Sequence, residues 1–564
     1  MSGRVTRAML PVAVAAGLLV ASSRLPVPQA QESPILAAMR DELKRSMAEL
    51  RLKDEPAPYY IDYEIDDLST LRVIGRLGAL LDDTVGRSRT LYVDVRVGDY
   101  AFDSSRFVVQ GRGGGGGGDG SASTPLDDDY DVMRRQIWLT TDAAYKRAVS
   151  VFARKKAAFQ NRVGVEAIPD LSKETPVETI RPGGGPSSAR RIWIDRAREL
   201  SAIFSSSPAI ESSDVWAIET RGTRYYVNSE GFTTVAPVQL ASLRVVAESQ
   251  ADDSMTVREG FSLVENRLED LPPVPVLAAR VRDVAERLTA RRTAPVGEDF
   301  TGPVLLEGQA SAEFVAQTLV PLMLARRSAD SDNPRFAQSQ PGTPFLRRIG
   351  LRVLSDAFAA SDTPSLATYE GRPVPGSYVA DDEGMRPKDV VLVEKGRLVT
   401  LLTSRTPQKN FLQSNGHGRA GGAQAGVFQV ESSQAVPAAE LKGKYLELLK
   451  AQDKAYGYIV RGVANPSEIA VGGGPGGPFI LDAVKVTLDG REEPVRGLRF
   501  GAVAPTAFRD LVEASQERQL YSYRVSTTDA ASLVVPSLMF EELEIQKVTD
   551  VLQKPPVVPS PWRN

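Results

Sequence analysis

Residues 59–66 have the sequence YYIDYEID, in which apolar and acidic side chains alternate. Successive side chains of a β-strand point to opposite faces, so this stretch predicts a strand with one apolar and one acidic face. The two faces hold Ile61, Tyr63 and Ile65, and Asp62, Glu64 and Asp66. Residues 90–98 repeat the alternation, with Leu91, Val93, Val95 and Val97 on one face. Together the stretches predict an antiparallel sheet that packs one face on a core and wets the other.

The segments around this sheet predict an α+β protein, with an N-terminal α/β domain followed by a β-rich C-terminal domain. Helical periodicity predicts helices at 35–52, 137–156 and 276–288. Residues 215–227 predict a hairpin that turns at Arg221-Gly222, and residues 390–404 predict one that turns at Lys395-Gly396. Further predicted elements are a helix at 439–449, a hairpin around Asp489-Gly490 and a strand at 537–548.

Consecutive prolines stop both helix and sheet, so the sequence LPPVP at 271–275 predicts a domain boundary. We expect the N-terminal domain, with glycine-rich insertions such as 111–123, at 31–275 and the β-rich domain at 276–550. A proline-rich tail follows at 551–564.

The N-terminus has the pattern of a signal peptide. Arg4 and Arg7 precede the apolar run MLPVAVAAGLLVA at 9–21, and small residues follow. We therefore expect residues 1–30 to be a leader and the protein to be periplasmic or extracellular. The alternative is a buried N-terminal helix. No later segment approaches roughly 18 uninterrupted apolar residues, so we expect no stable membrane anchor after leader removal.

The composition excludes several kinds of site. The 564 residues include no cysteine and one histidine, His417. Cysteine nucleophiles, disulfides and cysteine-ligated zinc are therefore excluded, as is an H-E-x-x-H helix. The net charge of −3 argues against nucleic acid as a partner.

The densest unusual chemistry lies between residues 376 and 422. Three carboxylates, Asp381, Asp382 and Glu383, precede a glycine, and Arg405 follows the predicted hairpin. The loop NGHGR at 415–419 then holds the single histidine between two glycines, which permit close backbone approach. Such a loop could bind an anion or polarise a carbonyl. Alternatively, its polar side chains only fix a tight turn.

The order of these motifs resembles the TldD/PmbA family of metallopeptidase-related proteins. The motifs that carry the resemblance are YVNSEG at 226–231, GPVLLE at 302–307 followed by a helix from about Ala310, DDEG at 381–384, the 390–402 hairpin, SR at 404–405, NGHGR at 415–419 and EPVRGLRF at 493–500. The resemblance covers most of residues 210–548. It implies an N-terminal α/β domain, a β-rich C-terminal domain of the TldD/PmbA type and peptide handling.

The chain departs from the family where its peptidases hold their metal. Those members carry H-E-x-x-x-H on the helix after the strand that corresponds to Val304–Glu307, and a later cysteine. Here the helix reads GQASAEFVAQ at 308–317, with neither histidine. Glu307, Glu313 and the distant His417 are the remaining candidate ligands for zinc. We expect no metal site in this chain, and zinc only if a partner subunit supplies or shares it.

The resemblance therefore implies a motif-less, non-catalytic subunit that pairs with a paralogous metallopeptidase and takes in peptides or unfolded segments. We expect Asp381, Asp382, Glu383, Arg405, Asn415, Gly416 and Arg419 to bind substrate, with His417 as the candidate catalytic residue. One alternative is an autonomous hydrolase with His417 as base and Ser404 or Ser414 as nucleophile. Another is a peptide-binding structural module.

Overall fold

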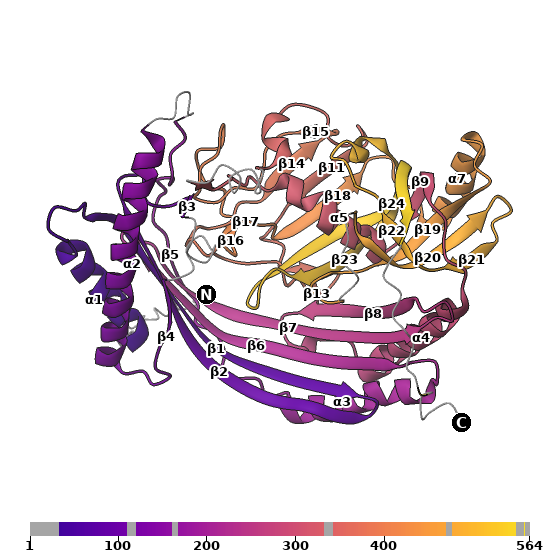
Figure 1. Cartoon of the computed structure of the whole chain (residues 1–564), viewed down its shortest axis with the longest axis horizontal. Coiled ribbons are helices and arrows are strands. Elements are labelled where there is room, and N and C mark those ends of the chain that lie inside the picture. The colour runs from indigo at the N-terminus through magenta and orange to yellow at the C-terminus, as the bar shows by residue number, and fades with distance from the viewer. Residues whose placement is uncertain are drawn as a thin grey trace, which may run out of the picture.

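The structure, a computed structural model, describes residues 33–109, 120–160, 167–331, 342–469 and 476–548, together with Val558. Two sheets lie one above the other, with a long curved sheet below a more irregular one (Figure 1). The expected leader, most of the first glycine-rich insertion and the tail apart from Val558 lie outside the described residues.

The first sheet has seven strands in the order β4-β2-β1-β6-β7-β5, with β8 paired to β7. Its long strands are antiparallel, and Tyr63 of β1 lies opposite Val93 of β2 as the alternation predicted. The strands are β1 (Pro58–Arg76), β2 (Ala79–Val97), β4 (Ser121–Ser123), β5 (Glu178–Ile180), β6 (Ser212–Asn228), β7 (Thr233–Gln250) and β8 (Thr256–Glu265). A short strand, β3 (Phe107–Val108), pairs separately with β10 (Asp330–Ser331).

Helices cover one face of this sheet in two groups. At one end, α1 (Pro34–Glu49) and α2 (Tyr130–Phe159) share a core with the apolar side chains of β1 and β2. At the other, α3 (Arg190–Ala202) packs mainly on β1 and α4 (Val274–Thr293) packs on β7 and β8 (Figure 1). The helix that follows the expected boundary at 275 thus shares its core with the first sheet.

The hairpin predicted at 215–227 is wrong, because β6 runs without a turn from Ser212 to Asn228. Gly222 sits inside the strand, where it pairs with Leu68 of β1. A Cβ at this position would lie 2.0 Å from the carbonyl oxygen of Asp67. The glycine is therefore needed for close approach between strands, not for a turn.

The second sheet has eleven strands, nine of them in the order β15-β14-β11-β18-β24-β22-β20-β19-β9. The last long strand, β24, pairs with β9, β18, β22 and β23. The strands are β9 (Phe300–Leu306), β11 (Phe358–Asp362), β14 (Val390–Glu394), β15 (Arg397–Leu398), β18 (Val427–Ser432), β19 (Tyr456–Val463), β20 (Phe479–Thr487), β21 (Glu492–Val495), β22 (Leu498–Phe500), β23 (Leu511–Arg524) and β24 (Ala530–Lys547). Two short ribbons complete the domain: β12 (Thr368–Tyr369) with β13 (Arg372–Pro373), and β16 (Gly418–Arg419) with β17 (Gly422–Ala423).

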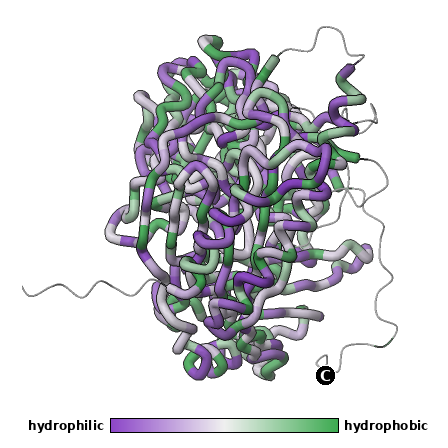
Figure 2. The backbone as a smooth tube through the Cα atoms, turned by 90° about the vertical axis from the view of Figure 1, so that its left-hand side faces the viewer, coloured by the Kyte–Doolittle hydropathy of each residue, from purple (hydrophilic) through white to green (hydrophobic). Residues whose placement is uncertain are grey.

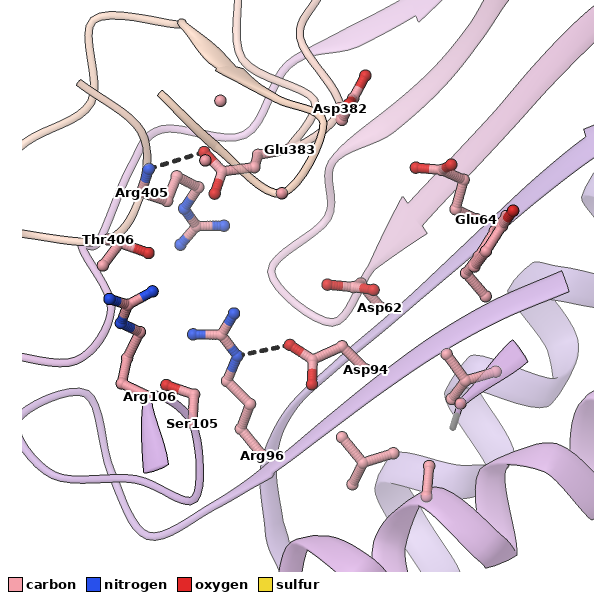
Figure 3. A pocket seen from close by; sticks show the side chains of 18 of the residues that line it. Asp62, Glu64, Asp94, Arg96, Ser105, Arg106, Asp382, Glu383, Arg405 and Thr406 are labelled. Carbon is pink, nitrogen blue, oxygen red and sulfur yellow. Dashed lines mark hydrogen bonds and ion pairs between the residues drawn. The ribbon is translucent and has the colours of Figure 1, made fainter. Parts of the chain in front are cut away.

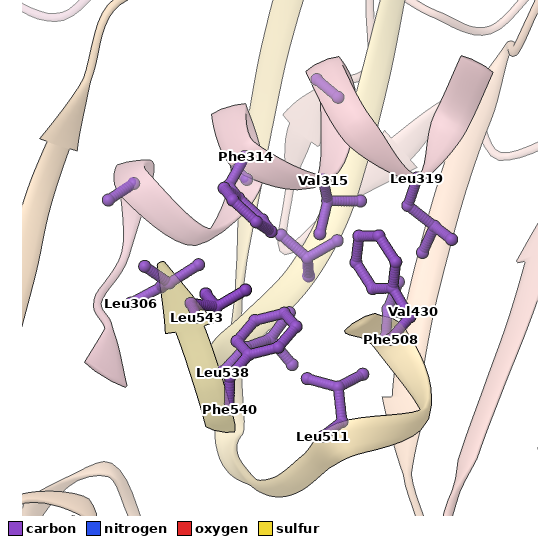
Figure 4. Packing of buried hydrophobic residues seen from close by; sticks show 14 of the residues in the cluster. Leu306, Phe314, Val315, Leu319, Val430, Phe508, Leu511, Leu538, Phe540 and Leu543 are labelled. Atoms are coloured by element: carbon purple, nitrogen blue, oxygen red, sulfur yellow. The ribbon is translucent and has the colours of Figure 1, made fainter. Parts of the chain in front are cut away.

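The largest core lies in this second domain (Figure 4). The helix α5 (Gln309–Thr318) packs on β19, β23 and β24, and its Phe314 sits among three other phenylalanines. A second helix, α7 (Ala438–Ala451), packs on β9 and β23. The turn predicted at Lys395-Gly396 is confirmed. Both residues have positive φ, as a two-residue hairpin turn requires.

Polar and apolar residues are interleaved along most of the chain (Figure 2). Within the described ranges, no helix combines the length and the apolar character needed to cross a bilayer.

Candidate functional site

A cavity of about 1030 Å³ lies between the two sheets. Its floor comes from the polar faces of β1, β2 and β6. Its roof comes from the second domain, with residues 382–383, 405–406, 420–422 and 526–529 (Figure 3). A cavity of this size is at the upper end of the range found for ligand sites.

The acidic face of β1 points into this cavity and not to the outer surface. Asp62, Glu64 and Asp66 all line it, and Asp94 joins them from β2. Asp62 and Asp94 are directly opposite in the strand register, which places like charges side by side. Burial, reinforced by Asp94, raises the pKa of Asp62 to about 7. Burial also raises the pKa of Glu64, against the opposing effect of Arg224.

We expect Asp62→Asn to stabilise the protein more at pH 8 than at pH 5. Because the folded-state pKa of Asp62 is raised, its contribution to stability is largest below pH 4 and is lost as the pH rises through about 7. The neutral amide avoids that loss. The gain in free energy of unfolding should be about 1–3 kcal/mol larger at pH 8 than at pH 5. Urea unfolding at both pH values measures it. Glu447→Gln, on the exposed side of α7, is the control, and an equal gain at both pH values would contradict the prediction.

Arg224 joins the two domains across the cavity. From β6, its Nε donates to Asp66 Oδ1 at 2.8 Å and its Nη1 donates to Asp382 Oδ1 at 2.5 Å. Its Nη2 donates to Thr528 Oγ1 at 2.9 Å and lies 3.7 Å from Asp529 Oδ2. Burial pushes the pKa of Asp529 upward, but Arg224 and Arg419 outweigh it and hold the pKa at about 2.

The three consecutive carboxylates have different roles. Asp381 does not line the cavity. Its Oδ1 accepts from the Glu383 and Met385 amides and its Oδ2 from the Gly418 amide, which is typical of an Asx turn. Asp382 and Glu383 do line the cavity. Burial raises the pKa of all three carboxyl groups.

Arg405 also reaches the cavity, and its guanidinium is already partnered. It donates to Ser172 O at 2.5 Å and forms an ion pair with Glu230 Oε2 at 2.5 Å. The guanidinium also lies over the Tyr60 and Phe232 rings, at 5.6 and 5.4 Å. Its backbone amide donates to Glu383 Oε2 at 2.7 Å, a bond drawn in Figure 3. Arg405 thus binds the two domains together at the cavity wall.

His417 lies in the interior and is not among the cavity-lining residues. Its Nδ1 faces Asn415 Oδ1 at 2.9 Å and its Nε2 faces Asp362 Oδ1 at 3.2 Å. A Cβ on Gly416 would lie 2.4 Å from Arg386 O, so glycine is needed there, as its position beside His417 predicted. These contacts are those of a histidine that fixes a loop, and its catalytic role stays a prediction.

The other predicted binding residues of this loop hold structure around the cavity. Asn415 accepts from the Thr403 amide at 2.8 Å and donates to Leu401 O at 2.9 Å. Arg419 is buried, lies 4.5 Å from the centre of the Tyr378 ring and donates to Ala530 O at 2.9 Å. Of the predicted set, only Asp382, Glu383 and Arg405 line the cavity.

Sequence reasoning missed Asp62, Glu64, Asp94, Arg96 and Arg224 as cavity residues. The sequence did mark Asp62 and Glu64, because both lie on the acidic face of a predicted strand. That pattern alone does not distinguish a face in solvent from one covered by a second domain.

The donor groups at the family's metal position do not fit zinc. Glu307 pairs with Arg461 at 2.9 Å. Glu313 is buried, accepts from Gln317 Nε2 at 2.8 Å and is hydrogen-bonded by Tyr521. Within the described ranges, no group of three or more histidine or acidic side chains could hold a metal ion. Zinc takes N, S or O ligands from about three or four protein groups, which these separately partnered residues do not supply.

Comparison with known proteins shows which proteins this chain is similar to. The family model of the PmbA/TldA metallopeptidase C-terminal domain matches residues 300–547. A metalloprotease from Methanothermobacter thermautotrophicus is 23% identical over 264 residues, which are 45% of this chain and 51% of that protein. Residues 300–547 therefore form a C-terminal domain of the TldD/PmbA family. The chain spans about half the length of the curated relative that it matches.

Two solved structures share the fold of this chain. A candidate modulator of a DNA gyrase from Thermotoga maritima matches with a TM-score of 0.57 and 15% identity, over 90% of this chain and 99% of that one. TldE from Thermococcus kodakarensis matches with a TM-score of 0.57 and 13% identity, over 90% of this chain and 100% of that one. The predicted fold class, an N-terminal α/β domain followed by a β-rich TldD/PmbA-type domain, is confirmed.

Proposed function

We propose that this TldD/PmbA-family chain is an exported, non-catalytic subunit of a metallopeptidase complex. In this role it holds peptides or unfolded segments in the cavity between its sheets, and a paralogous subunit with its own H-E-x-x-x-H motif supplies the zinc and the hydrolysis.

The state of α5 carries the proposal. In the family's peptidases the corresponding helix holds the metal. Here the single acidic side chain of the helix, Glu313, is buried and engaged by Tyr521 and Gln317. Burial raises its pKa, with both hydrogen bonds opposing. In this proposal the helix serves for packing, and its only acidic side chain is not free to bind a metal ion.

The cavity supports the peptide-holding half of the proposal. Its walls carry carboxylates and arginines together, so it can satisfy both the polar backbone and the charged ends of a peptide. A chain without a strong net charge suits peptides of varied sequence.

The contacts of His417 favour this role over an autonomous hydrolase. Ser414 Oγ bonds to Thr403 O at 3.3 Å and accepts from the Gly416 amide at 3.0 Å. The ring nitrogens of His417 face Asn415 and Asp362 instead. No hydrogen bond in the described part of the chain joins this histidine to Ser404 or Ser414, as nucleophile activation requires.

Purification of the full chain alone and together with a co-expressed paralogue that carries H-E-x-x-x-H tests the proposal. We expect the two to co-purify, zinc to follow the paralogue, and peptide hydrolysis to require its motif. Glu313→Gln in this chain should leave hydrolysis by the complex unchanged. Stoichiometric zinc in the lone chain, or chelator-sensitive hydrolysis by it, would overturn the proposal. Recovery from the periplasm or medium without the predicted leader, residues 1–30, tests export.

A further inference from the structure

Arg106 occupies one corner of the cavity in an unusual state. Its backbone has a φ of 60°, in the left-handed region that residues with a side chain rarely adopt. Its side chain lines the cavity, yet it has no hydrogen bond or ion pair with any residue in the described ranges. The neighbouring Ser105 Oγ also lines the cavity and is buried without a partner. Unsatisfied groups and backbone strain concentrate at functional sites.

The surrounding structure holds this corner in place. Ser105 N donates to Asp103 Oδ1 at 2.7 Å, and Lys155 Nζ donates to Ser105 O at 2.8 Å. Asp330 N donates to Arg106 O at 2.8 Å. Three bonds thus fix the backbone on both sides of the strained residue. The two free polar groups are therefore positioned in advance, which lowers the entropic cost of binding a ligand.

The corner is positively charged. Burial lowers the pKa of Arg106, and Arg327 and Arg96 lower it further, against the opposing effects of Asp170 and Asp330. The effects that lower this pKa prevail. The two neighbours are already committed, Arg327 to Asp170 at 3.3 Å and Arg96 to Asp94 at 2.7 Å. Of these three arginines, only Arg106 has a side chain without a hydrogen bond or ion pair to a described residue.

The wall formed by β1 has the opposite sign, because Asp62, Glu64 and Asp66 line the cavity there. Figure 3 shows the Arg96, Arg106 and Arg405 guanidinium groups pointing into the same space, with Asp62 and Glu64 farther along the wall. A ligand that suits both regions carries one negative and one positive group. A doubly charged phosphate would satisfy the arginines but would be repelled by the acidic wall.

We propose that Arg106 and Ser105 form a carboxylate-binding subsite, which takes the C-terminal carboxylate of a peptide held in the cavity. The guanidinium presents a planar fork that matches a carboxylate, and the serine hydroxyl adds a third donor. The peptide's amino group then lies toward the carboxylates of β1. This subsite rests on the proposed peptide-holding role and specifies which end of the peptide is recognised.

Calorimetry with the full chain tests the subsite, with tetraalanine, its C-terminal amide and inorganic phosphate as probes. We expect the free acid to bind about 10–100-fold more tightly than the amide, because a hydrogen bond between charged groups contributes about that much to affinity. Arg106→Gln should abolish this difference, and Arg106→Lys, which keeps the charge without the fork, should retain part of it. Arg282→Gln, exposed on α4, is the matched control and should change nothing.

A second measurement does not need the ligand. Because Arg106→Gln removes an unpaired cation beside Arg96 and Arg327, we expect the ligand-free variant to melt at or above the temperature of the unmodified protein. A lower melting temperature would assign Arg106 a structural role and overturn the subsite.

The binding outcomes separate the two proposals. Equal binding of acid and amide, unaffected by Arg106→Gln, overturns the subsite but leaves peptide holding intact. Failure of both peptides to bind overturns both. Arg106-dependent binding of phosphate without peptide binding makes the ligand a phosphate and overturns the carboxylate assignment.

Discussion

Arg224→Ala is expected to lower the free energy of unfolding by about 3–5 kcal/mol. The guanidinium holds carboxylates from three segments, namely Asp66 on β1, Asp382 in the second domain and Asp529 in the β23–β24 turn. Its removal leaves these groups buried without a counter-charge. Equilibrium urea unfolding measures the loss.

A matched arginine on the same sheet is the control for this prediction. Arg72 pairs with Asp82, but its side chain is 48% exposed. Arg72→Ala should therefore cost less than about 1 kcal/mol, as exposed ion pairs do. Similar losses for both variants would mean that solvent screens the Arg224 cluster and that it does not fasten the domains together. In Arg224→Ala we also expect the pKa of Asp529 to rise from about 2, which NMR titration detects.

Phe314→Ala is expected to lower the free energy of unfolding by about 3–5 kcal/mol. The ring is fully buried, and its centroid lies 4.7 Å from that of Phe500. It also lies 5.5 Å from the centroid of Phe540 (Figure 4). Alanine would leave a cavity that rigid strands on either side cannot close. The result matters for the proposed function because Phe314 adjoins Glu313 on α5, and a large loss identifies this helix as a packing element.

Leu412→Ala is the control for Phe314, because it also shortens an apolar side chain of the second domain. Leu412 is 58% exposed, so its truncation should change stability by less than about 0.5 kcal/mol. Denaturant unfolding of both variants gives the comparison. A small effect of Phe314→Ala would show that α5 can detach without loss of the core.

Local pattern was sufficient to predict the elements but not what covers them. Alternation at 59–66 located β1 and its apolar face, because that face packs on helices of the same domain. The opposite face meets residues more than 300 positions away, such as Asp382, and no local periodicity encodes that contact. The turn predicted at Arg221-Gly222 was wrong for a similar reason. The glycine is required by the close approach of the neighbouring strand, which the local sequence does not show.

The candidate site was predicted in part. Asp382 and Glu383 were predicted because they lie just before a glycine, and Arg405 because it follows a predicted hairpin; all three line the cavity. His417 attracted notice through its rarity, but rarity does not indicate exposure, and the residue is buried. Nothing in the sequence marked Arg224 as a site residue. Its role depends on the four carboxylates that surround it in the folded protein.

The position of β24 has a consequence for the order in which the chain can fold. This strand, at residues 530–547, pairs with four others in the second sheet, including β9 at residues 300–306. A ribosome makes β9 long before it makes β24, so the second domain stays without its central strand until residues 530–547 have been made. Contacts of such sequence separation also form slowly. The second domain therefore completes its sheet only after residues 300–529 have been made.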